Sequence, residues 1–277
     1  MKKFLVLTLS MLMLIMAFAG CSSETATTDE GGNTTSYDNL GIACELTSEE
    51  YGIGFRKGSD LTAEVNKIMD EMIADGSLNA LAEKYELTLA EAEAVEEIEV
   101  TTADIEYVKA NGKLVIGITD YEPMNYKDEN DQWTGFDTEF AIAVCEKLGV
   151  EAEFVEIDWD NKFVALESKV IDCIWNGMTI SEDVLNNTSC SKAYVKNAQV
   201  VVMAKDKIAE YSTPDTMTDL SFAVESGSAG AAAAADNNFA NVIEAGTQTD
   251  ALLEVASGSS DACIIDLTMA NAMLGLK

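Results

Sequence analysis

Segments typical of strands alternate with segments typical of helices twice along the chain, and this alternation constrains the fold more than any other feature. The first round contains a β-rich segment at residues 114–118, an amphipathic segment at 136–148 and a β-rich segment at 171–175. The second round covers residues 221–273. Strands that alternate with helices form parallel sheets, so the pattern predicts an α/β fold. Two rounds predict two lobes with a ligand cleft between them.

The acidic composition narrows the class of partner. The formal net charge is −32, the chain has no histidine, and Arg56 is its only arginine. Such a surface argues against nucleic acid and against electrostatic docking on anionic lipid. The solubility of an exported protein explains the charge more simply.

The N-terminus has the pattern of a secretory signal. Lys2 and Lys3 precede an apolar run at residues 4–19, which is shorter than the roughly twenty residues of a membrane-spanning helix. A basic start, an apolar middle and small residues before a cleavage site predict a signal peptide at residues 1–20.

The residues FAG before Cys21 resemble a bacterial lipobox, which implies that Cys21 carries lipid and becomes the new N-terminus. Residues 21–36 are rich in Ser, Thr, Gly and Glu, a composition that suits a flexible tether. The alternative is an ordinary signal peptide that happens to precede a cysteine. We expect an extracytoplasmic protein that is attached to the bacterial cell membrane through a lipid anchor only.

The remaining cysteines do not form a metal-binding pattern. They show no CxxC spacing, and zinc sites also tend to use histidine, so we predict no metal site and no cofactor. Cys145 and Cys173 lie in apolar patterns and are predicted to be buried thiols. Cys44 and Cys263 flank the two ends of one predicted lobe, so the sequence neither predicts nor excludes a disulfide between them.

No catalytic constellation stands out, so the sequence predicts a binding protein and not an enzyme. It has no histidine base, no GxSxG, no HExxH and no P-loop. The glycine-rich residues 226–230 have two interpretations. They form an ordinary strand-to-helix turn, or an anion cradle in which backbone N–H groups at the start of a helix face a carboxylate.

Several motifs resemble those of the polar amino-acid ABC transporter substrate-binding proteins, which have a type II periplasmic-binding-protein fold. The family's beginning is similar to KLVIGITDYEPMNY, which starts at Lys113, and WTGFDTEFAIAVCEKLGV and WNGMTI follow in the family's order. The family's ending is similar to YGIGFRKGSDLTAEVNKIMDEMIADGSLNALAEKYEL, which starts at Tyr51. Here the ending precedes the beginning, so the chain resembles a circularly permuted member.

The permutation implies particular lobe boundaries. Lobe 1 covers residues 56–202, in which residues 88–112 link the family's usual C- and N-termini. Lobe 2 and the hinge consist of residues 37–55 and 203–277. The alternative is a duplication or fusion that carries a stray helical segment, but YGIGFRKG occurs only once.

The resemblance also implies ligand-binding residues. Tyr121 falls on the aromatic position that packs over the ligand side chain, and Trp159 falls on a second aromatic position. The Gly177 carbonyl and the Thr179 hydroxyl fall where the family meets the ligand's amino group or carboxylate. For Trp159, an ordinary core position is the alternative.

In lobe 2 the resemblance places the ligand's α-carboxylate at Ser228 and Ala229, and it pairs Asp266 with the α-ammonium. The alternative for Asp266 is the N-cap of the following helix. One departure concerns Val184, which occupies the position of the family's carboxylate-binding arginine. The loss of such a charge-assisted hydrogen bond removes about 1.5–3 kcal/mol.

These features predict a solute-binding lipoprotein of an ABC importer that closes two lobes around a small polar ligand, with an amino acid as the leading class. Its partners are the ligand and the ABC permease subunits. Three alternatives remain: a receptor whose closure a partner protein senses, a binder of a cationic or neutral polar solute that is not an amino acid, and a decayed binder. Some dehydratases resemble this fold, but the absence of histidine disfavours an enzyme.

Overall fold

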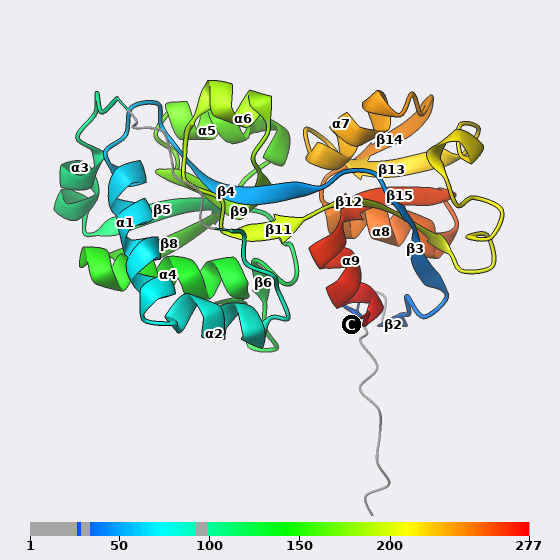
Figure 1. Ribbon diagram of the computed structural model, residues 1–277, viewed down its shortest axis with the longest axis horizontal. Helices are drawn as coiled ribbons and strands as arrows, with labels where there is room; N and C mark the ends of the chain where they lie inside the picture. The colour runs from blue at the N-terminus through cyan, green and yellow to red at the C-terminus, as the bar shows by residue number, and fades with distance from the viewer. Residues whose placement is uncertain (1–26, 29–33, 92–98, 277) are drawn as a thin grey trace, which may run out of the picture.

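Two sheets organise the molecule, one on each side of Figure 1, and the chain crosses between them twice within the described residues. The computed structural model describes residues 27–28, 34–91 and 99–276. The predicted signal peptide, Cys21 and Lys277 lie outside these residues, as does most of the predicted tether.

Lobe 1 is built on a six-stranded sheet whose strand order is β10-β4-β9-β5-β8, with β11 also paired to β4. The central pairs β5–β8 and β5–β9 are parallel, whereas β4 runs antiparallel to β9, β10 and β11. The strands are β4 Glu49–Phe55, β5 Lys113–Ile118, β8 Glu151–Glu156, β9 Cys173–Thr179, β10 Ser189–Cys190 and β11 Val195–Asn197.

Lobe 2 repeats this plan on a five-stranded sheet with the order β14-β13-β15-β12-β3. Strand β13 runs parallel to β14 and β15, and β12 runs antiparallel to β15 and β3. The strands are β3 Leu40–Glu45, β12 Gln199–Ala204, β13 Ser221–Glu225, β14 Asn241–Ala245 and β15 Ala262–Asp266.

Helices cover both sheets. In lobe 1, α5 and α6 lie on one side of the sheet in Figure 1, and α1, α2 and α4 lie on the other. The helices of lobe 1 are α1 Leu61–Ala74, α2 Ser77–Lys84, α3 Asp104–Asn111, α4 Phe136–Leu148, α5 Lys162–Glu167 and α6 Glu182–Asn187. Those of lobe 2 are α7 Ala229–Asp236, α8 Gln248–Ser257 and α9 Leu267–Leu274. Shorter elements are β1 Thr27–Thr28, β2 Thr34–Thr35, β6 Tyr126–Lys127, β7 Trp133–Thr134, η1 Trp159–Asn161 and η2 Pro214–Thr216.

Helix α1 shows why these residues form these elements. Five of its apolar residues recur mostly three or four positions apart, so they share one face, and that face is buried, whereas Ile73 lies outside it and is 37% exposed. This face packs on the sheet of lobe 1 beside α2 and α4. The buried apolar residues of α1 are Leu61, Val65, Ile68, Met69 and Met72.

The sheets place two strands on the other side of the boundaries that we expected. Strand β4, predicted to belong to lobe 2 and the hinge, pairs within the sheet of lobe 1. Strand β12, predicted to fall largely within lobe 1, lies between β15 and β3 in lobe 2. The chain therefore crosses between lobes at residues 46–48 and at Ala198. The local pattern could not show this, because a strand's lobe depends on distant partners.

Segments that precede β5 in the sequence complete both lobes. Strand β3 forms an edge of the sheet of lobe 2, and β4 lies inside the sheet of lobe 1. Helices α1 and α2 then pack against α4. The Tyr51-to-Leu87 stretch thus does not form a separate domain.

The cysteines among the described residues are free. Cys44 on β3 and Cys263 on β15 flank β12, where they pair with Val201 and Val202 respectively. Two strand spacings separate them by about 9.5 Å. A disulfide needs Cα atoms within about 7 Å, so this fold excludes the bridge that the sequence left open.

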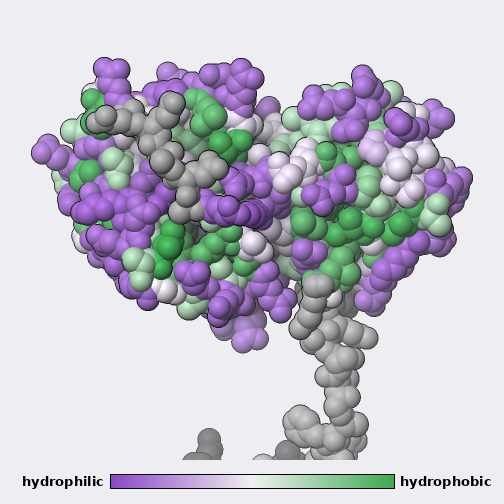
Figure 2. All heavy atoms as spheres, in the orientation of Figure 1, coloured by the Kyte–Doolittle hydropathy of each residue, from purple (hydrophilic) through white to green (hydrophobic). Residues whose placement is uncertain are grey.

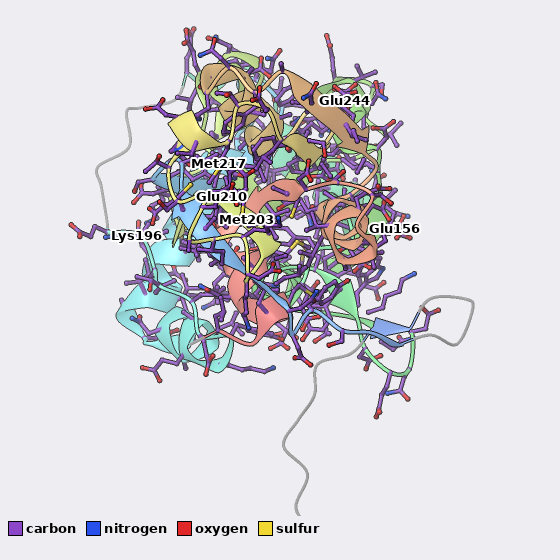
Figure 3. All side chains as sticks on the ribbon, turned by 90° about the vertical axis from the view of Figure 1, so that its right-hand side faces the viewer. Glu156, Lys196, Met203, Glu210, Met217 and Glu244 are labelled. Atoms are coloured by element: carbon purple, nitrogen blue, oxygen red, sulfur yellow. The ribbon has the colours of Figure 1, made fainter. Side chains whose placement is uncertain are left out.

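Hydrophilic side chains cover most of the face in Figure 2, and hydrophobic ones form separate patches on both lobes. Figure 3 shows Met203 and Met217 within lobe 2, where both are buried, and the exposed Lys196 and Glu244 toward the edges of the view. Within the described ranges, none of the helices combines the length and hydropathy that crossing a membrane requires.

Candidate ligand-binding site

A cavity of about 440 Å³ lies between the two lobes, and residues of both line it. Its volume falls within the roughly 300–1,000 Å³ of small-molecule pockets. The last residues of β9, β13 and β15 line the cavity, which agrees with binding at the carboxyl ends of strands. The ligand-binding residues predicted from the sequence all line it: Tyr121, Trp159, Gly177, Thr179, Ser228, Ala229 and Asp266.

Tyr121 packs against Gly177 on the lobe 1 side of the cavity. Gly177 has a φ of +53°, and a Cβ there would lie 2.6 Å from Cε1 of Tyr121, so the position requires glycine. The Tyr121 hydroxyl lies 2.5 Å from the Tyr51 hydroxyl and 2.5 Å from Oγ1 of Thr268. Because Thr268 belongs to α9, this hydrogen bond joins lobe 1 to lobe 2.

Asp137 holds the backbone of Gly177. Its Oδ2 accepts a hydrogen bond of 2.6 Å from the Gly177 N–H and one of 2.9 Å from the Tyr194 hydroxyl. Burial raises the pKa of Asp137 to about 7, and these hydrogen bonds work against the rise. Asp137 belongs to the GFD motif, to which the sequence assigned no ligand role.

Asp266 is surrounded by side-chain amides. Its Oδ1 accepts hydrogen bonds from Asn197 and, at 2.7 Å, from Gln199, and its Oδ2 accepts one from Gln248. The Oε1 of Gln248 in turn accepts a hydrogen bond of 2.8 Å from the Asp266 N–H. The carboxylate therefore has a fixed orientation.

Glu49 shares two of these donors with Asp266. Its Oε1 accepts hydrogen bonds of 2.7 Å from Asn197 and from Gln199, and one of 2.8 Å from the Thr179 hydroxyl. The two carboxylates therefore lie close together. Burial, followed by the negative charge of Glu49, raises the pKa of Asp266 to about 7.

The capping alternative for Asp266 is wrong. Asp266 directly precedes α9, but its side chain makes no capping hydrogen bond to that helix. Its oxygens accept hydrogen bonds from the amides of Asn197 in lobe 1 and of Gln199 and Gln248 in lobe 2.

Ser228 and Ala229 lie where α7 begins. The Ser228 hydroxyl accepts a hydrogen bond of 3.1 Å from the Ala231 N–H, so Ser228 is the N-cap of α7. Ala229, Ala231 and Ala232 all line the cavity. Their small side chains leave room for a ligand at the N-terminus of α7, where the helix dipole favours an anion.

Trp159 is 7% exposed and packs in a core cluster with Met178 and Val184. It also lines the cavity, so the Trp159 side chain belongs to the core and faces the cavity as well. Val184 is 3% exposed and lines the cavity from α6. The position predicted for the family's arginine thus faces the cavity with an aliphatic side chain.

Lys162 begins α5 and reaches lobe 2. Its Nζ donates hydrogen bonds to the carbonyl oxygens of Trp159 at 3.1 Å and Gly227 at 2.9 Å. Burial lowers the pKa of Lys162, and the negative charges of Asp183 and Glu225 offset part of this effect. Among the described residues that line the cavity, Lys162 is the only basic one.

Glu225 is the last residue of β13 and lines the cavity. It is 3% exposed, and no hydrogen bond to its carboxylate forms within the described part of the chain. Burial, followed by the negative charge of Asp266, raises the pKa of Glu225 to about 8.

The sequence did not reveal Glu49, Lys162, Glu225 or Gln248 as cavity residues. Glu225 had an available signal, because it ends a predicted strand, where α/β sheets bind ligand. Lys162 had none, since a lysine at a helix start is normally solvated. Glu49 and Gln248 enter through contacts with distant side chains, which no local pattern records.

Comparisons with known proteins agree with this fold. Residues 114–255 match the bacterial extracellular solute-binding proteins, family 3. The match covers just over half of the chain, and the chain belongs to that family. The predicted family and the two-lobe α/β fold class are confirmed.

The similar proteins include two curated ones. The L-cystine-binding protein TcyJ of Escherichia coli (strain K12) is 30% identical over 131 residues, which are 47% of this chain and 41% of that protein. The arginine-binding extracellular protein ArtP of Bacillus subtilis (strain 168) is 36% identical over 95 residues, 34% of this chain and 37% of that protein. The chain thus spans less than half the length of these relatives.

A solved structure of holo ArgBP from T. maritima has a TM-score of 0.59 to this chain at 31% identity. The superposition covers 61% of this chain and 76% of that one.

Proposed function

We propose that this protein binds a small polar solute, with an amino acid as the leading class, in the cavity between its lobes and delivers it to an ABC permease. One observation carries the proposal: the residues that the family resemblance predicted as ligand contacts, from both lobes, line one cavity. The relatives named as cystine- and arginine-binding proteins support the same class of ligand.

Each group of an amino acid has a counterpart in the cavity. Asp266, whose orientation the neighbouring amides fix, accepts hydrogen bonds from the ammonium. The carboxylate lies at the N-terminus of α7, near Ser228 and Ala229. Lys162 supplies positive charge at this end, where Val184 has replaced the family's arginine. Tyr121 and Trp159 pack against the aliphatic part of the ligand.

Binding closes the lobes about the two crossing segments, residues 46–48 and Ala198. The hydrogen bonds from Tyr121 to Thr268 and from Lys162 to Gly227 join the lobes and break when they open. A ligand that contacts both lobes favours the closed form, because only that form completes its contacts.

Calorimetric titration with the L-amino acids, supported by thermal-shift measurements, tests the proposal. The variant Ala232→Trp fills the cavity from the face of α7 and should abolish binding. Ala235→Trp is the matched control, because Ala235 is exposed on the same helix and does not line the cavity. Equal binding by both variants would contradict this location of the site.

We further propose that the chain is a circularly permuted member of its family. Strands β3 and β4 and helices α1 and α2 precede the matched residues 114–255 and yet complete the two lobes, which supports this order. A re-ordered chain, in which residues 36–91 follow residue 276, should fold and bind the same ligand. A re-ordered chain that stays unfolded would argue against the proposal.

Membrane attachment through lipid on Cys21 completes the proposed function, since several acyl chains hold a protein firmly at a bilayer. Cys21→Ala should lose lipid labelling and leave the membrane fraction, whereas Ser22→Ala should behave as the wild type does. Unchanged labelling of the Cys21→Ala protein would contradict the lipobox interpretation.

A further inference from the structure

Glu225 is a buried acid without a partner. Its side chain lines the cavity and is 3% exposed, and its Oε1 is fully buried with no hydrogen bond to the described part of the chain. Nearly all buried polar atoms in proteins have a hydrogen-bond partner, so this one requires a physical explanation.

The other charged groups of the cavity do not supply that partner. Lys162 donates to the carbonyl oxygens of Trp159 and Gly227, and it forms no ion pair within the described ranges. The remaining charged residues that line the cavity are acids: Glu49, Asp183, Asp236 and Asp266. The cavity therefore contains more negative charge than its own residues neutralise.

Protonation of Glu225 does not by itself provide its carboxyl group with a hydrogen-bond partner. Burial and the charge of Asp266 raise its pKa to about 8, so the carboxyl group keeps its proton at neutral pH. The protonated group still lacks a hydrogen-bond acceptor among the described residues. A cation in the cavity would pair with the carboxylate and lower its pKa.

Glu225 and Asp266 end neighbouring parallel strands. Residues Ala223 and Cys263 pair in the register of β13 and β15, so both strands finish at the same edge of the sheet. Two acceptors for positive charge thus lie at one edge of the cavity, one surrounded by amides and one free.

We propose that Glu225 binds a second cationic group of the ligand, so that the ligand is a small dibasic compound with one ammonium at Asp266 and another ammonium or guanidinium at Glu225. This inference rests on the proposed function. It adds a subsite in lobe 2 that the sequence resemblance did not indicate.

Two pairs of amino acids test the subsite, because the members of each pair differ only in the terminal ammonium: L-ornithine with L-norvaline, and L-lysine with L-norleucine. Calorimetry on the wild type should show at least one dibasic member binding roughly tenfold or more tightly than its neutral partner, the scale of a charge-assisted hydrogen bond.

Glu225→Gln keeps the shape of the side chain and should remove that preference, because the dibasic member loses far more affinity than its neutral partner does. Glu244→Gln is the matched control. Glu244 lies on the adjacent strand β14, is exposed and does not line the cavity, so the preference should persist. A Glu225→Gln protein that is folded by its melting curve and retains the full preference would overturn the subsite.

The proton balance provides a second readout. At pH 7, a dibasic ligand should displace protons from both Asp266 and Glu225 in the wild type, but from Asp266 alone in Glu225→Gln. Titrations in two buffers of different ionisation enthalpy measure this difference in proton release. No difference in proton release between the two proteins would also overturn the proposal.

The same titrations separate this inference from the proposed function. If neutral and dibasic amino acids bind the wild type equally well, the amino-acid function stands and the subsite is wrong. If no amino acid binds, and 1,4-diaminobutane and 1,5-diaminopentane do not bind either, both are wrong. If a diamine binds as tightly as its amino acid, the Glu225 subsite is supported and a carboxylate is not recognised.

Discussion

Asp266 and Glu225 end adjacent strands of one sheet, and these two buried acids differ in the hydrogen bonds that the rest of the protein donates to them. Asp266 receives hydrogen bonds from the amides of Asn197, Gln199 and Gln248. Glu225 receives none from the described residues. The difference teaches that a buried acid can be part of a rigid framework or an acceptor that its own protein leaves unsatisfied. Only the second kind points directly to a ligand.

The largest expected effect concerns pH. The folded protein holds the proton of Glu225 up to a pKa of about 8, whereas the ordinary value is 4.5. Between these values only the folded state keeps the proton, so stability is present at low pH and is lost as pH rises through 8. Each pKa unit corresponds to about 1.4 kcal/mol, so the unfolding free energy should fall by about 3–4 kcal/mol more in the wild type than in Glu225→Gln between pH 5 and 8.5.

Urea denaturation at several pH values measures this difference. The charged groups that act on Glu225 are Lys162, Asp158, Asp250 and Asp266. Asp266 has a raised pKa of its own and contributes the same sign in both proteins, so the difference between them reports Glu225 together with its electrostatic interaction with Asp266. If the unfolding free energy of the two proteins changes with pH in the same way, folding does not raise the pKa of Glu225.

The second effect concerns the framework acid. Asp266→Ala should lower the unfolding free energy by about 2–3 kcal/mol, because it leaves buried amide donors, above all that of Gln248, without their acceptor. Asp236→Ala is the control, since Asp236 is exposed at the same cavity. Urea denaturation at pH 8.5 makes the measurement, and equal stability of both variants would mean that the amides do not depend on Asp266.

The third effect concerns the missing arginine. Val184→Arg should strengthen the binding of at least one free α-amino acid by roughly tenfold, through a charge-assisted bond to its carboxylate. It should not strengthen the binding of the amide of that amino acid, or of 1,4-diaminobutane. Val184→Gln, with a long but neutral side chain, is the calorimetric control. A gain that does not depend on the carboxylate would contradict this geometry.

The smallest effect concerns the contact between the lobes. Lys162→Met keeps the aliphatic chain but removes the hydrogen bond to the Gly227 carbonyl and the positive charge proposed to face the ligand carboxylate, so it should weaken ligand binding by about three- to tenfold. Lys169→Met, on the same lobe but away from the cavity, should bind as the wild type does. If both variants bind equally, neither the contact with Gly227 nor the charge of Lys162 favours binding.

Much of the fold was predictable because it depends on local patterns. The bounds of α4 agree with the sequence to the residue, since its periodicity and the flanking glycine Gly149 define them. The lobe boundaries were not predictable in this way. The apolar residues of strand β12 would suit the sheet of either lobe, and only the pairing of β12 with β15 and β3 assigns it to lobe 2.

The residues of the candidate site were likewise predictable only where the sequence around them carries the signal. Asp266 was predicted because the family resemblance places an ammonium-pairing acid there, but the amides that hold it come from distant residues that no motif includes. Lys162 and Glu225 were missed because charged residues are normally solvated, and sequence patterns do not show burial. The absence of an arginine at Val184 was visible at once, whereas the lysine that lies in the same cavity required the structure.

One measurement tests the central claim that Asp266 and Glu225 bind different cationic groups of one ligand. L-ornithine, L-norvaline and 5-aminopentanoate form a set in which the second compound lacks the terminal amine and the third lacks the α-amine. Calorimetry with Asp266→Asn and Glu225→Gln should give crossed results. Asp266→Asn should lose only the preference for ornithine over 5-aminopentanoate and keep the preference over norvaline. Glu225→Gln should lose only the preference for ornithine over norvaline and keep the preference over 5-aminopentanoate. Two folded variants that both keep the wild-type preferences would contradict the claim.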